Sequence, residues 1–125
     1  MQNHNSKFKS DLKIRCYRFS LDLISLLDSL PNQRSCWIIA DQLLRSGTSI
    51  GANLVEAASS GSKLEFKRFH EIALKSANET KYWLGLLRDS GKANKEKANK
   101  LLAEVTEISN MLAAGILKLK GKTNF

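Results

Sequence analysis

Apolar residues recur along the chain in steps of three and four, the spacing of helices that each bury one face. Polar turn residues interrupt this pattern at residues 31–34, 59–62 and 90–92. We therefore predict four helices, at about residues 10–30, 36–58, 63–89 and 94–120. Helices of this length joined by short turns specify an all-α, antiparallel up-down-up-down four-helix bundle. We expect residues 1–125 to form this single domain.

Short polar side chains are candidates for capping the helix starts. Ser10 or Asp11 is predicted to cap the first helix and Ser35 the second. Ser62 is followed three residues later by Glu65, the spacing of a capping box, and is predicted to cap the third helix.

The first helix carries two apolar stripes on nearly opposite sides. One stripe consists of Leu12, Cys16, Phe19, Leu23, Leu26 and Leu30. The other consists of Ile14, Tyr17, Leu21 and Ile24. Only one stripe can face the rest of the bundle, because the two are separated by more than a right angle around the helix. The second stripe needs another partner, so we expect an oligomer.

Glycine marks one contact and one helix end. Gly47 and Gly51 lie four residues apart and share a face of the second helix. Glycine inside a helix costs about 1 kcal/mol relative to alanine, so we expect a neighbouring helix to approach closely there. The alternative is a phosphate-binding loop, although neither a Walker lysine spacing nor a GxGxxG motif is present. Gly91 is predicted to end the third helix.

Polar residues line one side of the second helix. They are Arg45, Ser49, Asn53 and Glu56, and Glu79 lies beside the apolar stripe of the third helix. Arg45 and Glu56 would be about 16 Å apart along the axis, too far to pair with each other. Two interpretations remain open: a solvated polar face, or a hydrogen-bond network between helices or subunits that fixes their register.

Twenty Lys and Arg residues against twelve Asp and Glu residues give a net charge of +8. In the predicted bundle, one end would gather Lys7, Lys9, Lys63, Lys67, Arg68, Lys118, Lys120 and Lys122. The other end would hold Arg34, Arg88, Lys92, Lys95 and Lys97. The first cluster predicts binding to nucleic acid through the phosphate backbone and without reading bases. The alternative is a charge that maintains solubility.

Motifs for catalysis and metal binding are incomplete. His70 and Glu71 match the start of the HExxH zinc motif, but position 74 is leucine. We expect His70 to be a partly exposed helix residue and Cys16 to be an unreactive core thiol. The sequence therefore predicts a protein that is not an enzyme, with no metal and no cofactor.

The chain shows neither an apolar signal region nor an apolar run of about 18 residues that could span a membrane. We therefore expect a cytoplasmic protein with no membrane partner and with reduced thiols.

The run from Gln42 to Glu56 resembles the central signature of bacterial four-helix-bundle proteins encoded within intervening sequences of 23S ribosomal RNA genes. Its core reads Arg-Ser-x2-Ser-x3-Asn-x2-Glu. Residues of the following helix fit the same pattern: Phe69, Ala73, Leu74, Ser76, Glu79 and Thr80. The resemblance covers nearly the whole chain and departs from the family at Ala57, where glycine is usual.

This resemblance implies a bundle that assembles into a homopentamer. It also implies a relation to the accessory proteins of diversity-generating retroelements, which are basic pentameric barrels that bind nucleic acid and a reverse transcriptase. We therefore expect an oligomeric protein that binds nucleic acid, structured RNA rather than DNA. The alternative is a pentameric adaptor that recruits a protein partner, an enzyme such as a reverse transcriptase, and uses its charge mainly for solubility.

Overall fold

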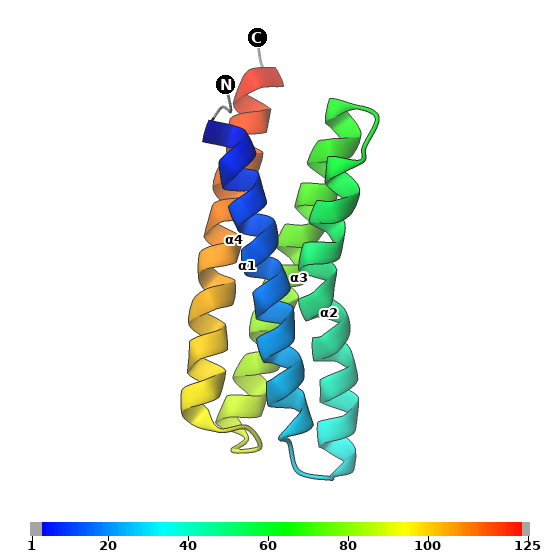
Figure 1. Cartoon of the computed structure of the whole chain (residues 1–125). Helices are drawn as coiled ribbons and strands as arrows, with labels where there is room; N and C mark the ends of the chain where they lie inside the picture. The colour runs from blue at the N-terminus through cyan, green and yellow to red at the C-terminus, as the bar shows by residue number, and fades with distance from the viewer. Residues whose placement is uncertain (1–3, 124–125) are drawn as a thin grey trace.

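The computed structural model describes residues 4–123, and the side chains of residues 11–121. The described residues form four helices and no strand. The helices are α1 (His4–Asp28), α2 (Arg34–Ala58), α3 (Lys63–Asp89) and α4 (Lys95–Thr123). They alternate in direction, so α1 begins and α4 ends beside the α2–α3 turn (Figure 1). The predicted all-α antiparallel bundle is confirmed.

The two ends of the bundle hold different connections. The terminal end is the end that holds the start of α1, the finish of α4 and the α2–α3 turn at residues 59–62 (Figure 1). The loop end is the opposite one, where residues 29–33 join α1 to α2 and residues 90–94 join α3 to α4.

Two predicted caps are wrong. Ser10 and Asp11 lie inside α1, which begins at His4, because no proline or glycine interrupts the helix between residues 4 and 11. Ser35 lies inside α2, whose N-cap residue is Gln33 in extended conformation (φ −131°, ψ 148°) without a side-chain cap. Serine tolerates a first-turn position as well as a cap, so its presence alone does not fix where a helix begins.

The ends of α3 follow the prediction. The backbone N–H of Glu65 donates to Ser62 Oγ at 3.1 Å. At the other end Gly91 has a φ of +74°, the left-handed conformation that glycine adopts at low cost just after a helix. The next helix is capped by Asn94, whose Oδ1 accepts from Lys97 N–H at 3.0 Å.

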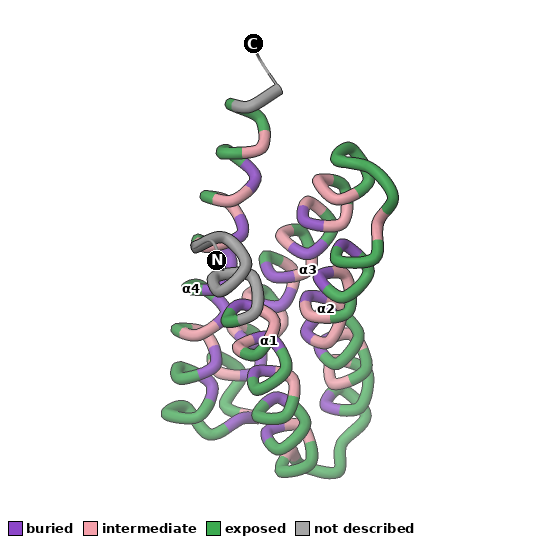
Figure 2. Tube along the Cα trace, turned by 45° about the horizontal axis from the view of Figure 1, so that its top comes forward, coloured by how far each residue is buried: buried purple, intermediate pink, exposed green. Residues whose placement is uncertain are grey.

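The core runs along the inner faces of all four helices (Figure 2). Its largest fully buried side chains include Phe19, Leu23, Leu43, Ile50, Leu84, Leu87, Ile108 and Leu112. The predicted inner stripe of α1 is buried from Leu12 to Leu26, and Leu30 is half-buried beyond the helix end. Among the described residues, no helix is both long enough and apolar enough to cross a membrane.

α1 and α2 approach closely at two glycines. A Cβ atom placed on Gly47 would overlap the side chain of Leu23, and one on Gly51 would lie 3.2 Å from the Cβ of Cys16. α2 continues unbroken through both positions. The predicted close approach is confirmed, and the alternative of a phosphate-binding loop is wrong.

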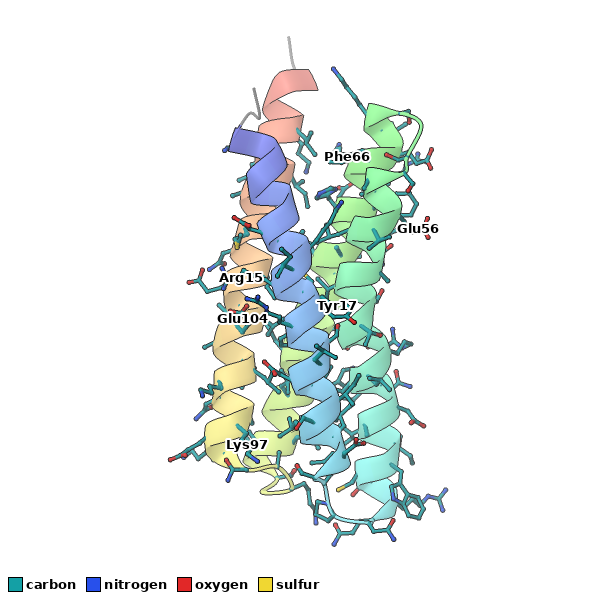
Figure 3. All side chains as sticks on the ribbon, viewed as in Figure 1. Arg15, Tyr17, Glu56, Phe66, Lys97 and Glu104 are labelled. Atoms are coloured by element: carbon teal, nitrogen blue, oxygen red, sulfur yellow. The ribbon has the colours of Figure 1, made fainter. Side chains whose placement is uncertain are left out.

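The second apolar stripe of α1 faces away from the core. Ile14, Tyr17, Leu21 and Ile24 keep 48%, 69%, 52% and 42% of their surface exposed. We call these four residues the α1 ridge; Figure 3 shows Tyr17 along the outer side of α1. As predicted, one stripe of α1 packs in the bundle and the other does not. An apolar strip of this kind is a usual mark of a protein–protein contact.

Candidate nucleic-acid interface

The terminal end gathers positive charge from two helices. Lys63, Lys67 and Arg68 lie in the first two turns of α3, and Lys118 and Lys120 lie near the end of α4. All of these are exposed except Lys67, which is half-buried. The predicted Lys7, Lys9 and Lys122 belong to the same ends of α1 and α4, but their side chains lie outside the described residues.

A cleft at this end is lined by the end of α2, the α2–α3 turn and the start of α3, together with one residue of α4. Its volume is about 830 Å³, and its walls include Lys63, Lys67, Phe66 and Leu119. Lys63 and Lys67 of α3 line this cleft, and Leu119, which lines it from α4, is flanked in the sequence by the exposed Lys118 and Lys120. The positive end of the α3 dipole is offset there by the negative ends of α2 and α4, so the attraction for anions comes from the side chains. The acidic residues Glu56 and Glu65 lie near the same turn and reduce the net charge.

At the loop end, part of the predicted positive charge is engaged within the subunit. Arg88 donates to Asp89 Oδ1 at 2.9 Å and to Asn99 Oδ1 at 3.0 Å. Lys92 Nζ donates to Gln33 Oε1 at 2.7 Å, which ties the two loops together. These contacts give Arg88 and Lys92 a structural role, and Arg34, Lys95 and Lys97 remain exposed.

The polar side of α2 meets α3. Arg45 donates to Glu79, and the same carboxylate accepts from Trp83 Nε1 at 2.8 Å. The hydrogen bonds from Trp83 and Arg45 lower the pKa of Glu79 below its ordinary value. Arg45 and Glu79 keep 56% and 37% of their side-chain surface exposed, so this ion pair lies at the surface between the two helices.

Hydroxyl groups extend the contact between α2 and α3 into the interior of the bundle. Ser76 Oγ donates to Ser49 Oγ at 3.2 Å, and Asn53 Nδ2 donates to the same Ser49 Oγ at 2.9 Å. One helical turn away, Thr80 Oγ1 donates to the buried Ser46 Oγ at 3.0 Å. Four of the five predicted network residues therefore join within α2 and α3.

Glu56 is the fifth predicted network residue, and it lies apart. Its side chain is exposed near the end of α2 (Figure 3). No hydrogen bond or ion pair of its carboxylate occurs within the part of the chain that the structure describes. The structure thus gives Arg45 a partner on another helix, whereas a partner for Glu56 must come from elsewhere or from solvent.

Sequence reasoning missed one ion pair. Arg15 on α1 binds Glu104 on α4 through two hydrogen bonds, Nε to Oε2 at 3.0 Å and Nη2 to Oε1 at 2.6 Å (Figure 3). The Glu104 carboxylate raises the pKa of Arg15. The two residues are 89 positions apart, so no local spacing could have indicated the pair.

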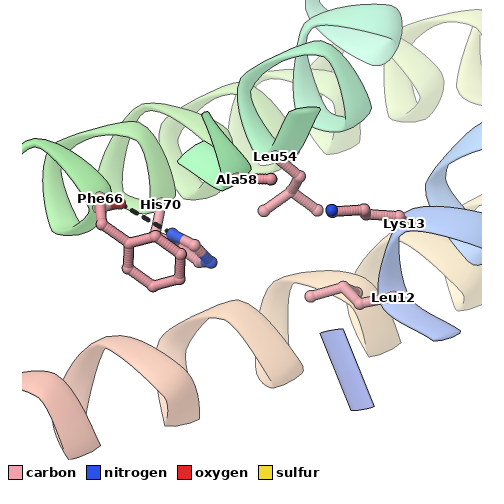
Figure 4. Close-up of a pocket in the computed structure, with 6 residues that line it drawn as sticks. All are labelled: Leu12, Lys13, Leu54, Ala58, Phe66 and His70. Atoms are coloured by element: carbon pink, nitrogen blue, oxygen red, sulfur yellow. Dashed lines mark hydrogen bonds between the residues drawn. The ribbon is translucent and has the colours of Figure 1, made fainter. Parts of the chain in front are cut away.

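A pocket of about 240 Å³ opens among α1, α2 and α3 near the terminal end (Figure 4). It is lined by Leu12, Lys13, Leu54, Ala58, Phe66 and His70. His70 is 9% exposed, so the prediction of a partly exposed residue is wrong. Its ring packs on Phe66 with centroids 4.3 Å apart, and Nδ1–H donates to the Phe66 carbonyl at 2.9 Å. His70 is buried because it belongs to the inner stripe of α3, with Ala73 and Ala77.

The remaining candidate chemistry is structural. Burial raises the pKa of the Cys16 thiol to about 12, which keeps it protonated and unreactive at neutral pH. Within the described residues, no three His, Cys, Asp or Glu side chains are grouped so as to hold a metal ion.

Comparison with known proteins points to one family. The family model of the 23S rRNA-intervening sequence protein matches residues 9–114. Among solved structures, the chain is similar to a protein of unknown function from the S23 ribosomal protein family of Bacteroides thetaiotaomicron. The two are 36% identical with a TM-score of 0.81, over 87% of this chain and 97% of that chain. No curated protein matches the chain.

Proposed function

The chain belongs to the 23S rRNA-intervening sequence protein family, and from this premise we propose that it is a non-catalytic, oligomeric protein that binds structured RNA through the phosphate backbone. The observation that carries the proposal is the cation cluster of the terminal end. There Lys63, Lys67 and Arg68 in the first turns of α3 are at the same end of the bundle as Lys118 and Lys120 of α4, and Lys63 and Lys67 line a cleft that Leu119 of α4 also lines. Cations held by two rigid helices can contact several phosphates at once.

The chemistry of the cluster favours backbone contacts over base readout. Four of its five described cations are lysines, which attract phosphates as point charges and form no fixed bidentate pattern with a base edge. The structure of the RNA would then be recognised through the arrangement of its phosphates.

Assembly is the second part of the proposal, and the α1 ridge supports it. The four apolar side chains of the ridge are each 42–69% exposed, and contact with another copy of the chain would remove this surface from water. The family resemblance gives the number five. A pentamer would repeat the terminal-end cluster five times, which raises the affinity for an extended RNA through multivalency. An exposed Glu56 would accept hydrogen bonds across such a contact.

The test is fluorescence anisotropy with three labelled probes of equal charge: an RNA hairpin, a DNA duplex and a single strand. We expect the RNA hairpin to bind most tightly. The matched variants are Lys63→Gln with Lys118→Gln in the terminal end, and Lys75→Gln with Lys81→Gln in the middle of α3, which remove the same charge. Only the terminal-end pair should weaken binding beyond the general effect of charge.

Equal and weak binding of all three probes would contradict the RNA proposal. The charge would then serve solubility, and the adaptor function would take precedence. A protein partner, such as a reverse transcriptase, that stays bound after nuclease treatment and at high salt would support the adaptor in its place.

A further inference from the structure

A second basic surface lies in a groove between α1 and α4. The groove has a volume of about 540 Å³. It is lined by Arg18, Phe19, Asp22, Ser25 and Leu26 of α1 and by Lys97, Lys100, Leu101 and Glu104 of α4. Figure 3 shows Lys97 toward the loop end of α4, with Arg15 and Glu104 farther up between the same two helices. The groove is thus on the side of the bundle and is separate from the terminal end.

Cations stand on both walls of this groove. Arg18 belongs to α1, whereas Lys97 and Lys100 belong to α4, and all three side chains are exposed. Lys97 and Lys100 are nearly one helical turn apart, about 4.5 Å along the axis. An anion between the helices would therefore meet positive charge from both sides.

The acidic residues of the groove are partly neutralised. Glu104 is held by both hydrogen bonds of Arg15, so its charge is compensated from within the protein. Asp22 forms no ion pair with any residue that the structure describes. Because Arg15 compensates the charge of Glu104, the groove keeps three positive charges and the single negative charge of Asp22. The groove therefore attracts anions.

The floor of the groove is apolar. Phe19, Leu26 and Leu101 are 1%, 3% and 6% exposed and form its base. A nucleic-acid backbone suits this groove, because its phosphates can contact the charged walls while its sugars cover the apolar floor. An isolated phosphate ion would contact only the charged walls. The groove also follows the direction of two helices, which favours an extended ligand.

We propose that the α1–α4 groove binds a segment of the RNA phosphodiester backbone through Arg18, Lys97 and Lys100. The proposal rests on the proposed function and adds a second contact surface to it. Because the terminal end and the groove are on different parts of one subunit, a single RNA can run from one to the other. Asp22 limits the affinity of the groove, since it places a carboxylate beside the phosphates.

The experiment compares two triple variants that lower the net charge equally. The groove variant is Arg18→Gln with Lys97→Gln and Lys100→Gln. The control is Arg34→Gln with Lys75→Gln and Lys81→Gln, which are cations outside both surfaces. Circular dichroism first verifies that both variants keep the helical fold. Affinity for a fluorescein-labelled RNA hairpin is then measured by anisotropy across a range of salt concentrations.

We expect the groove variant to lose about tenfold or more in affinity, and its log–log salt slope to become shallower by about 2 to 3. The control should keep a slope close to that of the wild type. The single variant Asp22→Asn should bind several-fold more tightly than the wild type. This gain cannot come from a folding defect, which makes it the stricter part of the experiment.

The outcomes separate the two proposals. If the wild type binds RNA but the groove variant and the control bind it equally, or Asp22→Asn brings no gain, the groove proposal is overturned and the proposed function stands. If the wild type binds no RNA at all, the proposed function fails and the groove proposal fails with it.

Discussion

The α1 ridge provides a prediction whose size follows from the structure. Burying a whole Leu or Ile side chain contributes about 1.5–3 kcal/mol. Leu21 and Ile14 already bury about half of their surface within the subunit, keeping 52% and 48% exposed. Covering the remaining half in an oligomer would contribute about 1 kcal/mol for each residue. The double variant Ile14→Ala with Leu21→Ala should therefore weaken each subunit contact by about 2 kcal/mol, or about thirtyfold in dissociation constant.

Sedimentation velocity over a range of protein concentrations measures this effect. The matched control is Leu64→Ala with Leu117→Ala, two leucines outside the ridge that keep 58% and 68% of their surface exposed. It removes similar apolar surface without touching α1, so its assembly should equal that of the wild type. A wild type that stays monomeric at all concentrations, or a control that dissociates as readily as the ridge variant, would refute the reasoning.

Three further predictions concern the fold of the subunit. In urea unfolding, Gly47→Ala should destabilise the subunit by about 1 kcal/mol, because overpacking against Leu23 costs more than the gain in helix propensity. Gly85→Ala should stabilise it by about 1 kcal/mol, because no atom lies within 4 Å of the new Cβ. The lowered pKa of Glu79 gives stability that is present above the ordinary carboxyl pKa and is lost as the pH falls through the lower folded value. In the variant Glu79→Gln, the free energy of unfolding should therefore fall less steeply than in the wild type as the pH is lowered through the acidic range. An equally steep fall in the variant would contradict this. Cys16, with a pKa of about 12, should react with iodoacetamide at neutral pH only after urea is added, as peptide mass spectrometry would show.

Local periodicity accounts for the parts of the fold that the sequence predicted well. The two stripes of α1 follow from steps of three and four, and the structure buries one and exposes the other. Gly47 and Gly51 indicated the close approach of a helix for a similar reason, because residues four apart share a helical face. The cluster at the terminal end required only the up-down order of the helices.

Features that depend on contacts between distant segments could not be predicted. Arg15 and Glu104 pair only because α1 and α4 are adjacent at one particular register. The groove cations were visible in the sequence as separate charges, but nothing indicated that Arg18 would face Lys97 and Lys100. The burial of His70, in contrast, follows from local spacing, because His70 lies three residues before Ala73 and seven before Ala77 on the buried stripe of α3.

Backbone binding of RNA is the central claim, and its salt dependence tests it most directly. Affinity of the nuclease-treated wild type for an RNA hairpin would be measured from about 50 to 200 mM salt. Contacts to several phosphates predict a straight log–log line with a slope of about −3 or steeper, because each contact releases condensed counterions. A slope near zero, or affinity too weak to measure at the lowest salt concentration, would contradict the claim.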